Sequence, residues 1–586
     1  MRQSLRVRLL IVAGVIALLA TVGVAGSAAK GHPKQKTVQA AVSANDKLKQ
    51  IKHIVVVYEE NHSFDNLYGG WEGVNGLSKA DTAHTVQVNQ GGTPYTCLLQ
   101  NDVNLAVPPL GASCTDTTTG STFSSAFPNG PFLIDSYIPA SATTCPKPVG
   151  AFFAHGVVNG QGNPGGCTED IVHRYYQEQY QIDGGKQDRY VTGSDSIGLV
   201  MGHYDTKALP IYQYLHGRKA PHYAIADKFF QGAFGGSYLN HAVFVSAQAQ
   251  IFANADNAGD ANDLHSVVDA NGEPNNYPLY HSPLGTAVKD LQLTASCSPP
   301  AGRPAAPAGV TCGDYAVNTI QPFYQPYAPG TADAKRLPPL TSPNIGDELS
   351  AKRVDWAWYS GGWSNADGDV GASGWTNGTG PKCSDPQALA TAVYPNCPDV
   401  DFQFHHQAFN YWASFAPGTQ ARKDHLKDET EFFDLANGSS KKCGLKQVSF
   451  IKPVGEENEH PGYASESQGS DHLVELLKAV EGSSCAKDTM VIVTYDEFGG
   501  QWDHVPPPGA GSPTQGPHDQ WGPGTRVPAL ILAPDLPGNF VVDHTEHDTT
   551  SILATIEHRF GVAALTNRDR TVPDLSSVWK AKEAKK

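Results

Sequence analysis

The chain has 586 residues, and its 58 acidic and 42 basic side chains give a formal net charge of −16 at pH 7. This balance argues against nucleic acid as the main partner and against strong attraction to anionic membranes, because both require a basic face. Only 17% of the residues are charged while Gly and Pro are plentiful, a composition typical of a compact core surrounded by long ordered loops.

The first residues have the pattern of a secretory signal peptide. Three arginines precede an apolar run, Leu9–Ala20, and small residues follow in Val24–Ala29. A basic start, an apolar middle and a small-residue cleavage region predict a signal peptide over residues 1–29, and therefore a secreted or periplasmic protein. The alternative is a membrane anchor, because Leu9–Val24 is only slightly shorter than a spanning helix. The small residues favour cleavage, and no later stretch is long and apolar enough to span a bilayer.

The ten cysteines support export. In an oxidising compartment they could close five short loops, although sequence does not fix the connectivity. No CxxC occurs, which argues against a zinc ribbon or a thioredoxin-like redox site. The neighbouring couples are Cys97/Cys114, Cys145/Cys167, Cys297/Cys312, Cys383/Cys397 and Cys443/Cys485.

Apolar runs without polar alternation predict buried strands. Ile51–Tyr58, Thr489–Tyr495 and Val527–Ala533 are rich in β-branched residues and have no polar face. Val448–Pro453 is a further candidate strand. Because helical stretches separate these runs, we expect an α/β fold with a mainly parallel central sheet and helices on both faces.

Two segments have apolar residues at helical spacing. Ser470–Val480 is predicted to be a helix capped by Ser470 or Asp471, and Asp548–Phe560 a helix that ends at Gly561.

The rest of the chain is predicted to be less regular. We expect a flexible leader over residues 30–49 and a C-terminal tail over 566–586. The stretches 85–170 and 255–400 hold eight of the ten cysteines and many Gly, Pro and Asn residues. They are predicted to be loop-rich insertions that carry disulfides.

The first candidate ligands follow the first predicted strand, in the segment YEENHSFD. Glu60 and Asn61 would lie at the carboxyl end of a buried parallel strand, where such folds bind ligands. Their oxygens suit a divalent cation. The alternative is a polar loop with a helix cap, because Asn, Ser and Asp are common cap residues.

A second strand ends in the same way, in the segment TYDEFGGQWDH. Asp496 and Glu497 are adjacent acids that repel each other unless a cation binds or a pKa rises. Two strands that each end in paired oxygen ligands are best explained by one shared divalent metal site.

A serine follows two glycines between these segments, at Gly235-Gly236-Ser237. Backbone N–H groups at a helix start could bind an anion there. A serine hydroxyl becomes a competent nucleophile when a metal binds it as the alkoxide. In isolation, however, this pattern favours an ordinary helix cap.

Histidines and a lysine supply the remaining candidates: His405, His406, His460, His173 and Lys186. A lone histidine is usually structural. A group of them around a metal and a serine could compensate the charge of a phosphoryl group and protonate a leaving oxygen. No role is assigned to five others: His62, His203, His222, His241 and His504.

At this point the motifs resemble a known family. IKHIVVVYEENHSFDNLYG, DKFFQGAFGGSYLNH, FQFHHQAFN, the EHP triplet and TYDEFGGQWDHVPPP are similar to the bacterial phosphoesterase family, in the family's order. That family contains secreted phospholipases C and acid phosphatases of the A type, with an alkaline-phosphatase-like sandwich fold. The resemblance implies one catalytic domain over residues 50–565.

The resemblance also implies roles for single residues. Ser237 is the implied nucleophile, and the implied proton-transfer residues are His406 and His460. The implied phosphate-binding residues are His173, Lys186, Asn240 and His405. The implied metal ligands are Glu60, Asn61, Ser237, Asp496 and Glu497.

Three departures from the family pattern bear on the substrate. His241, Phe498 and Thr549 stand where many relatives, especially the phospholipases, have Arg, His and His. They resemble the acid phosphatase branch, which implies a secreted acid phosphatase acting on small phosphomonoesters through a phosphoserine. The alternative is a phospholipase C that cleaves phosphatidylcholine-type diesters at the lipid headgroup.

A sulfatase and a non-catalytic binding protein fit the sequence less well. No Cys-x-Pro-x-Arg occurs to supply the nucleophile of a sulfatase, and the intact ligand set argues against a protein that only binds. If the histidines act in their protonated form, activity would peak on the acid side of neutral.

Overall fold

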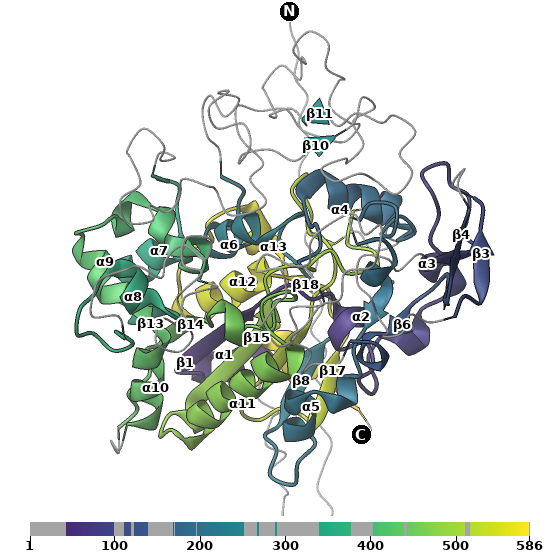
Figure 1. The fold of residues 1–586 in the computed structure, drawn as a ribbon. Coiled ribbons are helices and arrows are strands. Elements are labelled where there is room, and N and C mark those ends of the chain that lie inside the picture. Colours follow the sequence, from purple (N-terminus) through teal and green to yellow (C-terminus); the bar gives the residue numbers. More distant parts are fainter. Residues whose placement is uncertain are drawn as a thin grey trace, which may run out of the picture. The chain divides into compact units, whose positions relative to one another are not determined.

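A nine-stranded mixed sheet lies at the centre of the unit Ser43–Lys586 (Figure 1). In this computed structural model the structure describes residues 43–98, 111–118, 122–138, 168, 170–194, 196–250, 267–268, 288–289, 339–376, 402–438, 442–509 and 516–584. The predicted signal peptide lies outside the described residues, as do most of the leader and much of both predicted insertions.

The strand order is β13-β12-β14-β1-β15-β16-β8-β17-β19. All these strands except β16 and β19 run in one direction. The α/β fold with a mainly parallel sheet is therefore confirmed. The strands are β1 His53–Glu59, β8 Tyr223–Ala226, β12 Trp356–Ser360, β13 Leu426–Asp428, β14 Val448–Lys452, β15 Thr489–Tyr495, β16 Ala529–Leu532, β17 Phe540–Asp543 and β19 Lys582–Glu583.

The predicted strands correspond to β1, β14, β15 and β16. However, β16 pairs antiparallel with both of its neighbours, β15 and β8. An apolar run shows that a strand is buried on both faces but does not show its direction. The prediction of a loop-rich insertion over 255–400 is wrong at Trp356–Ser360. These residues form the buried strand β12, which pairs with β13 and β14.

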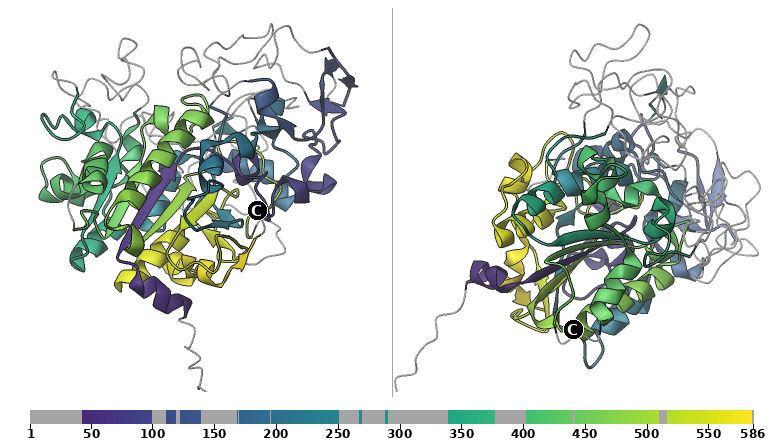
Figure 2. Two further views of the ribbon diagram at one scale, coloured as in Figure 1. Left: turned by 90° about the horizontal axis from the view of Figure 1, so that it is seen from below. Right: turned by 90° about the vertical axis from the view of Figure 1, so that its left-hand side faces the viewer.

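Helices cover both faces of the sheet. α6 packs on the face of Tyr58 and Phe450 through Phe244, and contacts α12. On the other face α10 contacts β12 through Phe432 and packs against α11, which contacts α5. Figure 2 shows α12, in yellow, and α11, in green, on opposite sides of the sheet.

The helices of the described segments are α1 Ala44–Gln50, α2 Phe64–Leu67, α3 Thr82–Thr85, α4 Tyr175–Ile182, α5 Pro210–Leu215, α6 Ser237–Ser246, α7 Ile345–Ala351, α8 Trp363–Asp367, α9 Gln420–His425, α10 Glu429–Asn437, α11 Glu466–Gly482, α12 Thr550–Phe560 and α13 Asn567–Thr571. None of them is long and apolar enough to cross a membrane.

Both predicted helices form, with corrected boundaries: α11 spans Glu466–Gly482 rather than Ser470–Val480, and α12 begins at Thr550 rather than Asp548. α12 ends where Gly561 takes a left-handed conformation, as expected. α11 begins earlier than predicted because Ser465 caps it by accepting a hydrogen bond from the backbone of Gln468. Ser470, the predicted cap, instead accepts a hydrogen bond from the backbone N–H of Ile211 in α5.

The ends of the described unit are more regular than the predicted leader and tail. α1 lies within the predicted leader and buries Ala44 and Leu48. α13 and the 3-10 helix Leu575–Lys580 lie within the predicted tail, and the latter buries Leu575 and Val578. The buried apolar side chains of α1 and of the 3-10 helix pack on the main core, and a capping box of Thr566 and Asp569 begins α13, which explains the regular structure.

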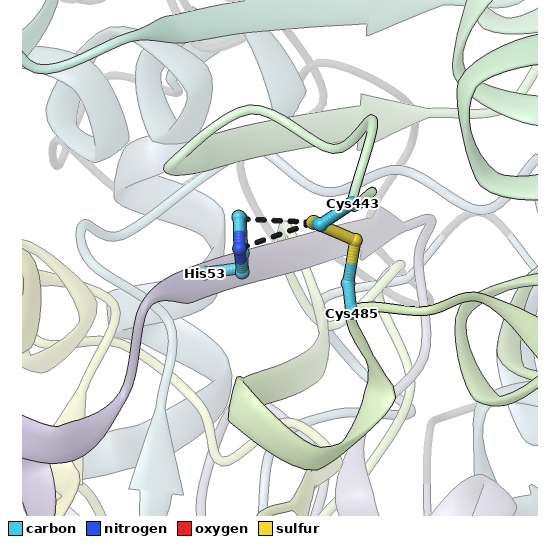
Figure 3. Close-up of side chains that lie close together, drawn as sticks. All are labelled: His53, Cys443 and Cys485. Atoms are coloured by element: carbon cyan, nitrogen blue, oxygen red, sulfur yellow. Dashed lines mark hydrogen bonds between the residues drawn. A yellow bond between two sulfur atoms is a disulfide. The ribbon is translucent and has the colours of Figure 1, made fainter. Parts of the chain in front are cut away.

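One of the predicted cysteine couples is a disulfide in the described residues. Cys443–Cys485 joins the segments that precede β14 and β15, and His53 Nε2 lies 3.1 Å from Cys443 Sγ (Figure 3). Cys97 and Cys114 are free thiols, so the predicted bond between them is not formed. The other three couples lie outside the described residues.

Removing this disulfide should destabilise the protein. The bond closes a loop with a sequence separation of 42, for which loss of unfolded-state entropy predicts a stabilisation of about 4 kcal/mol. The double variant Cys443→Ala/Cys485→Ala should lose that much free energy of unfolding in denaturant titrations. Cys97→Ser is the control because its thiol is free. A loss below about 1 kcal/mol in the double variant would contradict the prediction.

Candidate active site

The two predicted ligand pairs meet at one edge of the sheet. β1 and β15 are parallel neighbours with Glu59 opposite Tyr495, so the residues that follow each strand emerge side by side. The backbone N–H of Asn61 points at Asp496 Oδ1, at 3.3 Å. The carboxyl ends of parallel strands thus bring both pairs together, as predicted.

The two loops approach each other closely. Asn61 has a φ of 59°, a left-handed conformation that Asn tolerates better than most residues. A Cβ on Gly499, which has a φ of 62°, would lie 2.2 Å from the carbonyl oxygen of Asn61. Gly499 is therefore required for the contact between the loops that carry the ligands.

Ser237 faces the ligands and does not cap its helix. The N-cap of α6 is Gly236, and no side chain caps the first turn. The Ser237 hydroxyl instead donates towards Glu60 Oε2 and Glu497 Oε1, each at 3.4 Å. The helix-cap interpretation is therefore wrong, while the nucleophile assignment stays a prediction.

The oxygens around Ser237 fit a divalent cation. Asn61 Oδ1 and Asp496 Oδ2 are buried and have no hydrogen-bond partner in the described part of the chain. Burial and repulsion from Glu60 raise the pKa of Asp496 to about 7, and burial and Asp496 raise the pKa of Glu497. Hard, partly unpartnered oxygens from three neighbouring carboxylates and an amide are a suitable ligand set for such an ion.

Metal binding to this site should weaken as the pH falls below 7. A raised pKa means that Asp496 holds a proton below about pH 7 in the metal-free protein, and a cation must displace it. One displaced proton lowers the apparent affinity about tenfold per pH unit in that range. Calorimetry of metal binding in two buffers of different ionisation enthalpy would count the released protons. Affinity that does not change between pH 5.5 and 7 would contradict the prediction.

A buried lysine, Lys452, completes the charge balance and was not among the predicted residues. It is the last residue of β14, and its ammonium lies 2.5 Å from Glu60 Oε1 and donates to the carbonyl oxygen of Glu59. It also lies over the ring of Tyr58. The available signal was a lysine at the end of a buried strand, next to Pro453.

Three histidines line the site beside Glu60. His406 Nε2 lies 2.9 Å from Glu60 Oε1, and its ring stacks on His241, which also contacts the ring of His405. His241 Nδ1 donates to the carbonyl oxygen of Ser237. His241 is thus a site residue to which the sequence assigned no role; its spacing of four residues from Ser237 on one helix was the available signal.

Burial lowers the pKa of all three imidazoles, and the positive charge of Lys452 lowers it further. Neutral histidines are therefore favoured in the metal-free protein. The expected acidic pH optimum requires protonated histidines, and the lowered pKa values of these three imidazoles argue against it.

Two further predicted histidines contact the metal-ligand candidates. Asn61 Nδ2 donates to His460 Nε2 at 2.7 Å, while His460 Nδ1 donates to the carbonyl oxygen of Pro461. This arrangement turns Asn61 Oδ1 away from His460. His173 Nε2 lies 3.3 Å from Glu497 Oε1.

Two predicted phosphate-binding residues do not face the site. Lys186 is exposed, and its ammonium pairs with Asp183 at 2.7 Å on the surface. The Asn240 side chain bonds the local backbone, accepting from Ala233 and donating to Gly235 and Gly236. Both residues were predicted to bind phosphate from their positions in the family motifs. Their contacts in the structure are with Asp183 and with the local backbone.

Two of the histidines without a predicted role have structural contacts. His62 lies between Asn66 Oδ1 and the carbonyl oxygen of Glu459. His504 pairs with Asp65, which also binds the buried Arg526.

Comparison with known proteins assigns the sequence to a family. The sequence profile of the Phosphoesterase family matches residues 51–563. Phospholipase C B of Mycobacterium tuberculosis is 34% identical over 155 residues, which are 23% of this chain and 29% of that protein. Non-hemolytic phospholipase C of Burkholderia pseudomallei is 31% identical over 179 residues, 26% of this chain and 25% of that protein. The matched segments thus span less than a third of these relatives.

Among solved structures, a protein in the alkaline phosphatase superfamily from Vibrio parahaemolyticus is 15% identical. The match covers 40% of this chain and 51% of that chain with a TM-score of 0.21, which is too low to support a structural argument.

Proposed function

Because the chain belongs to the Phosphoesterase family, we propose that it is a phosphoric ester hydrolase with Ser237 as its nucleophile. The observation that carries the proposal is the position of the Ser237 hydroxyl, 3.4 Å from a carboxylate oxygen of each ligand pair. A serine that faces acidic ligands at a helix start, and caps nothing, is suited to attack on phosphorus.

The proposed reaction has two displacements. Ser237 Oγ attacks phosphorus in line, the bond from phosphorus to the leaving oxygen breaks, and a phosphoserine forms. Water then cleaves the phosphoserine and restores the hydroxyl. A divalent cation held by Glu60, Asn61, Asp496 and Glu497 would favour the ionised hydroxyl and offset the charge of the phosphoryl group.

The buried basic residues have three proposed tasks. Lys452 holds Glu60 in place through their ion pair. The imidazoles of His173 and His405 are proposed to bind phosphoryl oxygens. Neutral His406 is proposed to take up the proton that the Ser237 hydroxyl loses and to pass it to the leaving oxygen. His460 orients Asn61 and is a second candidate for this proton transfer.

We propose small phosphomonoesters as substrates, because His241, Phe498 and Thr549 resemble the acid phosphatase branch. A phospholipase C activity is the second candidate, and the names of the matched relatives favour it. Rates on p-nitrophenyl phosphate and on phosphatidylcholine micelles, measured across pH and metals, separate the two. Faster cleavage of the micelles would overturn the monoester proposal, and cleavage of neither would overturn the proposed function.

We further propose that the catalytic domain extends over residues 50–565 and that the protein is exported after loss of residues 1–29. The mass of the N-terminal peptide of the protein recovered from the culture medium or periplasm tests the export proposal. An intact N-terminus on that protein would contradict cleavage.

A further inference from the structure

Glu178, in α4, is a fully buried carboxylate that the proposed chemistry does not use. Its oxygen Oε2 accepts hydrogen bonds from the Gly235 backbone N–H at 2.5 Å and from Gln231 Nε2 at 2.9 Å. Its oxygen Oε1 accepts from the backbone N–H and the hydroxyl of Thr525, at 2.6 and 2.8 Å. Four donors thus converge on one carboxylate.

Gln231 extends this contact to the second ligand loop. Its Oε1 accepts a hydrogen bond from the backbone N–H of Phe498 at 2.9 Å, next to Glu497. Its Nε2 donates to the carbonyl oxygens of Ala233 and Gly235 as well as to Glu178. Glu178 and Gln231 together therefore hold both the loop that precedes the nucleophile and the loop that carries a metal ligand.

The loop before Ser237 is held by this contact from one side and by the Asn240 side chain from its own helix. Gly235 has a φ of 95°, and the first turn of α6 has no side-chain cap to fix its start. The space around Glu178 is also closely fitted, because a Cβ on Gly524 would lie 2.5 Å from Glu178 Oε1. Burial raises the pKa of Glu178 to about 7, while the four donors favour the ionised carboxylate, which has an acceptor site for each of them.

We propose that Glu178 is a positioning residue that, through Gln231, fixes the Ser237 hydroxyl relative to Glu497. This inference rests on the proposed role of Ser237 as the nucleophile. Glu178 acts through the backbone of Gly235 and touches no reacting atom. Because a misplacement of about 1 Å can cost about 100-fold in rate, its loss should slow attack more than substrate binding.

The test compares Glu178→Gln with Glu466→Gln. Gln has nearly the same shape, but its NH2 group must face either Gly235 or Thr525, whose N–H groups need acceptors. Glu466 is the matched control, because it is also a buried acid but its hydrogen-bonding partner is Tyr204, away from the serine loop. With metal-loaded enzyme and p-nitrophenyl phosphate, we expect Glu178→Gln to lower kcat about 10- to 100-fold and to change KM less than about threefold. Glu466→Gln should stay within about threefold in both.

A second readout does not depend on activity. Hydrogen exchange at Gly235 or Thr525, whose backbone N–H groups both donate to Glu178, should accelerate in Glu178→Gln and stay unchanged at both positions in Glu466→Gln. If Glu178→Gln does not fold, Gln231→Met serves instead, since it breaks the link to Phe498 but leaves Glu178 bonded to Thr525.

The two proposals fail in distinguishable ways. A wild-type protein that hydrolyses no phosphoester overturns the proposed function, while the exchange rates still show whether Glu178 fixes the two loops. Unchanged exchange at both positions, an unchanged kcat, or equal effects of Glu466→Gln overturn the positioning role.

Discussion

Ser237→Ala is expected to lower kcat by on the order of 10⁴-fold or more while the protein keeps its bound metal. The substitution removes the only hydroxyl that faces both Glu60 and Glu497 among the described residues. It leaves α6 intact, because Ala is a strong helix former and Gly236 is the N-cap. Steady-state rates and metal content per chain, measured on the same samples, would show the effect.

A second serine on the same helix provides the matched control. Ser246, at the other end of α6, is also buried, and its hydroxyl donates to the carbonyl oxygen of Ala242. Ser246→Ala should keep kcat within a small factor of wild type. Residual turnover above about 10% in Ser237→Ala would contradict the nucleophile assignment, because water cannot replace an oriented hydroxyl so efficiently.

Glu60→Gln is expected to weaken metal binding by on the order of 10²-fold or more, with a parallel loss of activity at limiting metal. The change removes a charged ligand but keeps an amide oxygen that can accept from Lys452, so the buried lysine retains a partner. Metal affinity from competition with a chelator, and activity as a function of metal concentration, measure the two effects.

The adjacent residue is the control for this change. Glu59 is equally buried and has Glu459, Lys452, His472 and Glu429 as its main electrostatic neighbours, while Ser237 and Asp496 are not among them. Burial raises the pKa of Glu59 well above normal, which favours the neutral form that Glu59→Gln also has. Equal losses of metal affinity in Glu59→Gln and Glu60→Gln would show that the effect comes from burial and not from coordination.

The sequence predicts the meeting of the two ligand pairs because its signal is local. An apolar run followed at once by paired polar residues defines a strand and its carboxyl end. Parallel pairing of β1 and β15 then brings the two carboxyl ends side by side. The direction of β16 and the strand Trp356–Ser360 were not predicted. The first depends on pairing partners, and the second is an aromatic run within a segment dominated by Gly, Pro and Asn.

The residues around the ligands were harder to predict. Lys452 was missed because lysine is almost never fully buried unless it is paired, and its partner Glu60 lies far away in the sequence. Lys186 and Asn240 were placed by family position alone, and their contacts with Asp183 and with the local backbone depend on this chain's own loops. Ser237 looked like a helix cap because serine is a common N-cap residue and follows two glycines. The N-cap is instead Gly236, one residue earlier.

The most direct test of the central claim is the identification of the covalent intermediate. The metal-loaded protein is mixed with p-nitrophenyl phosphate, quenched in acid during turnover, and digested for mass spectrometry. The account predicts one phosphoryl group on the peptide that contains Ser237, and none on the same peptide from Ser237→Ala. Turnover with no phosphoryl group on the peptide that contains Ser237 would contradict it.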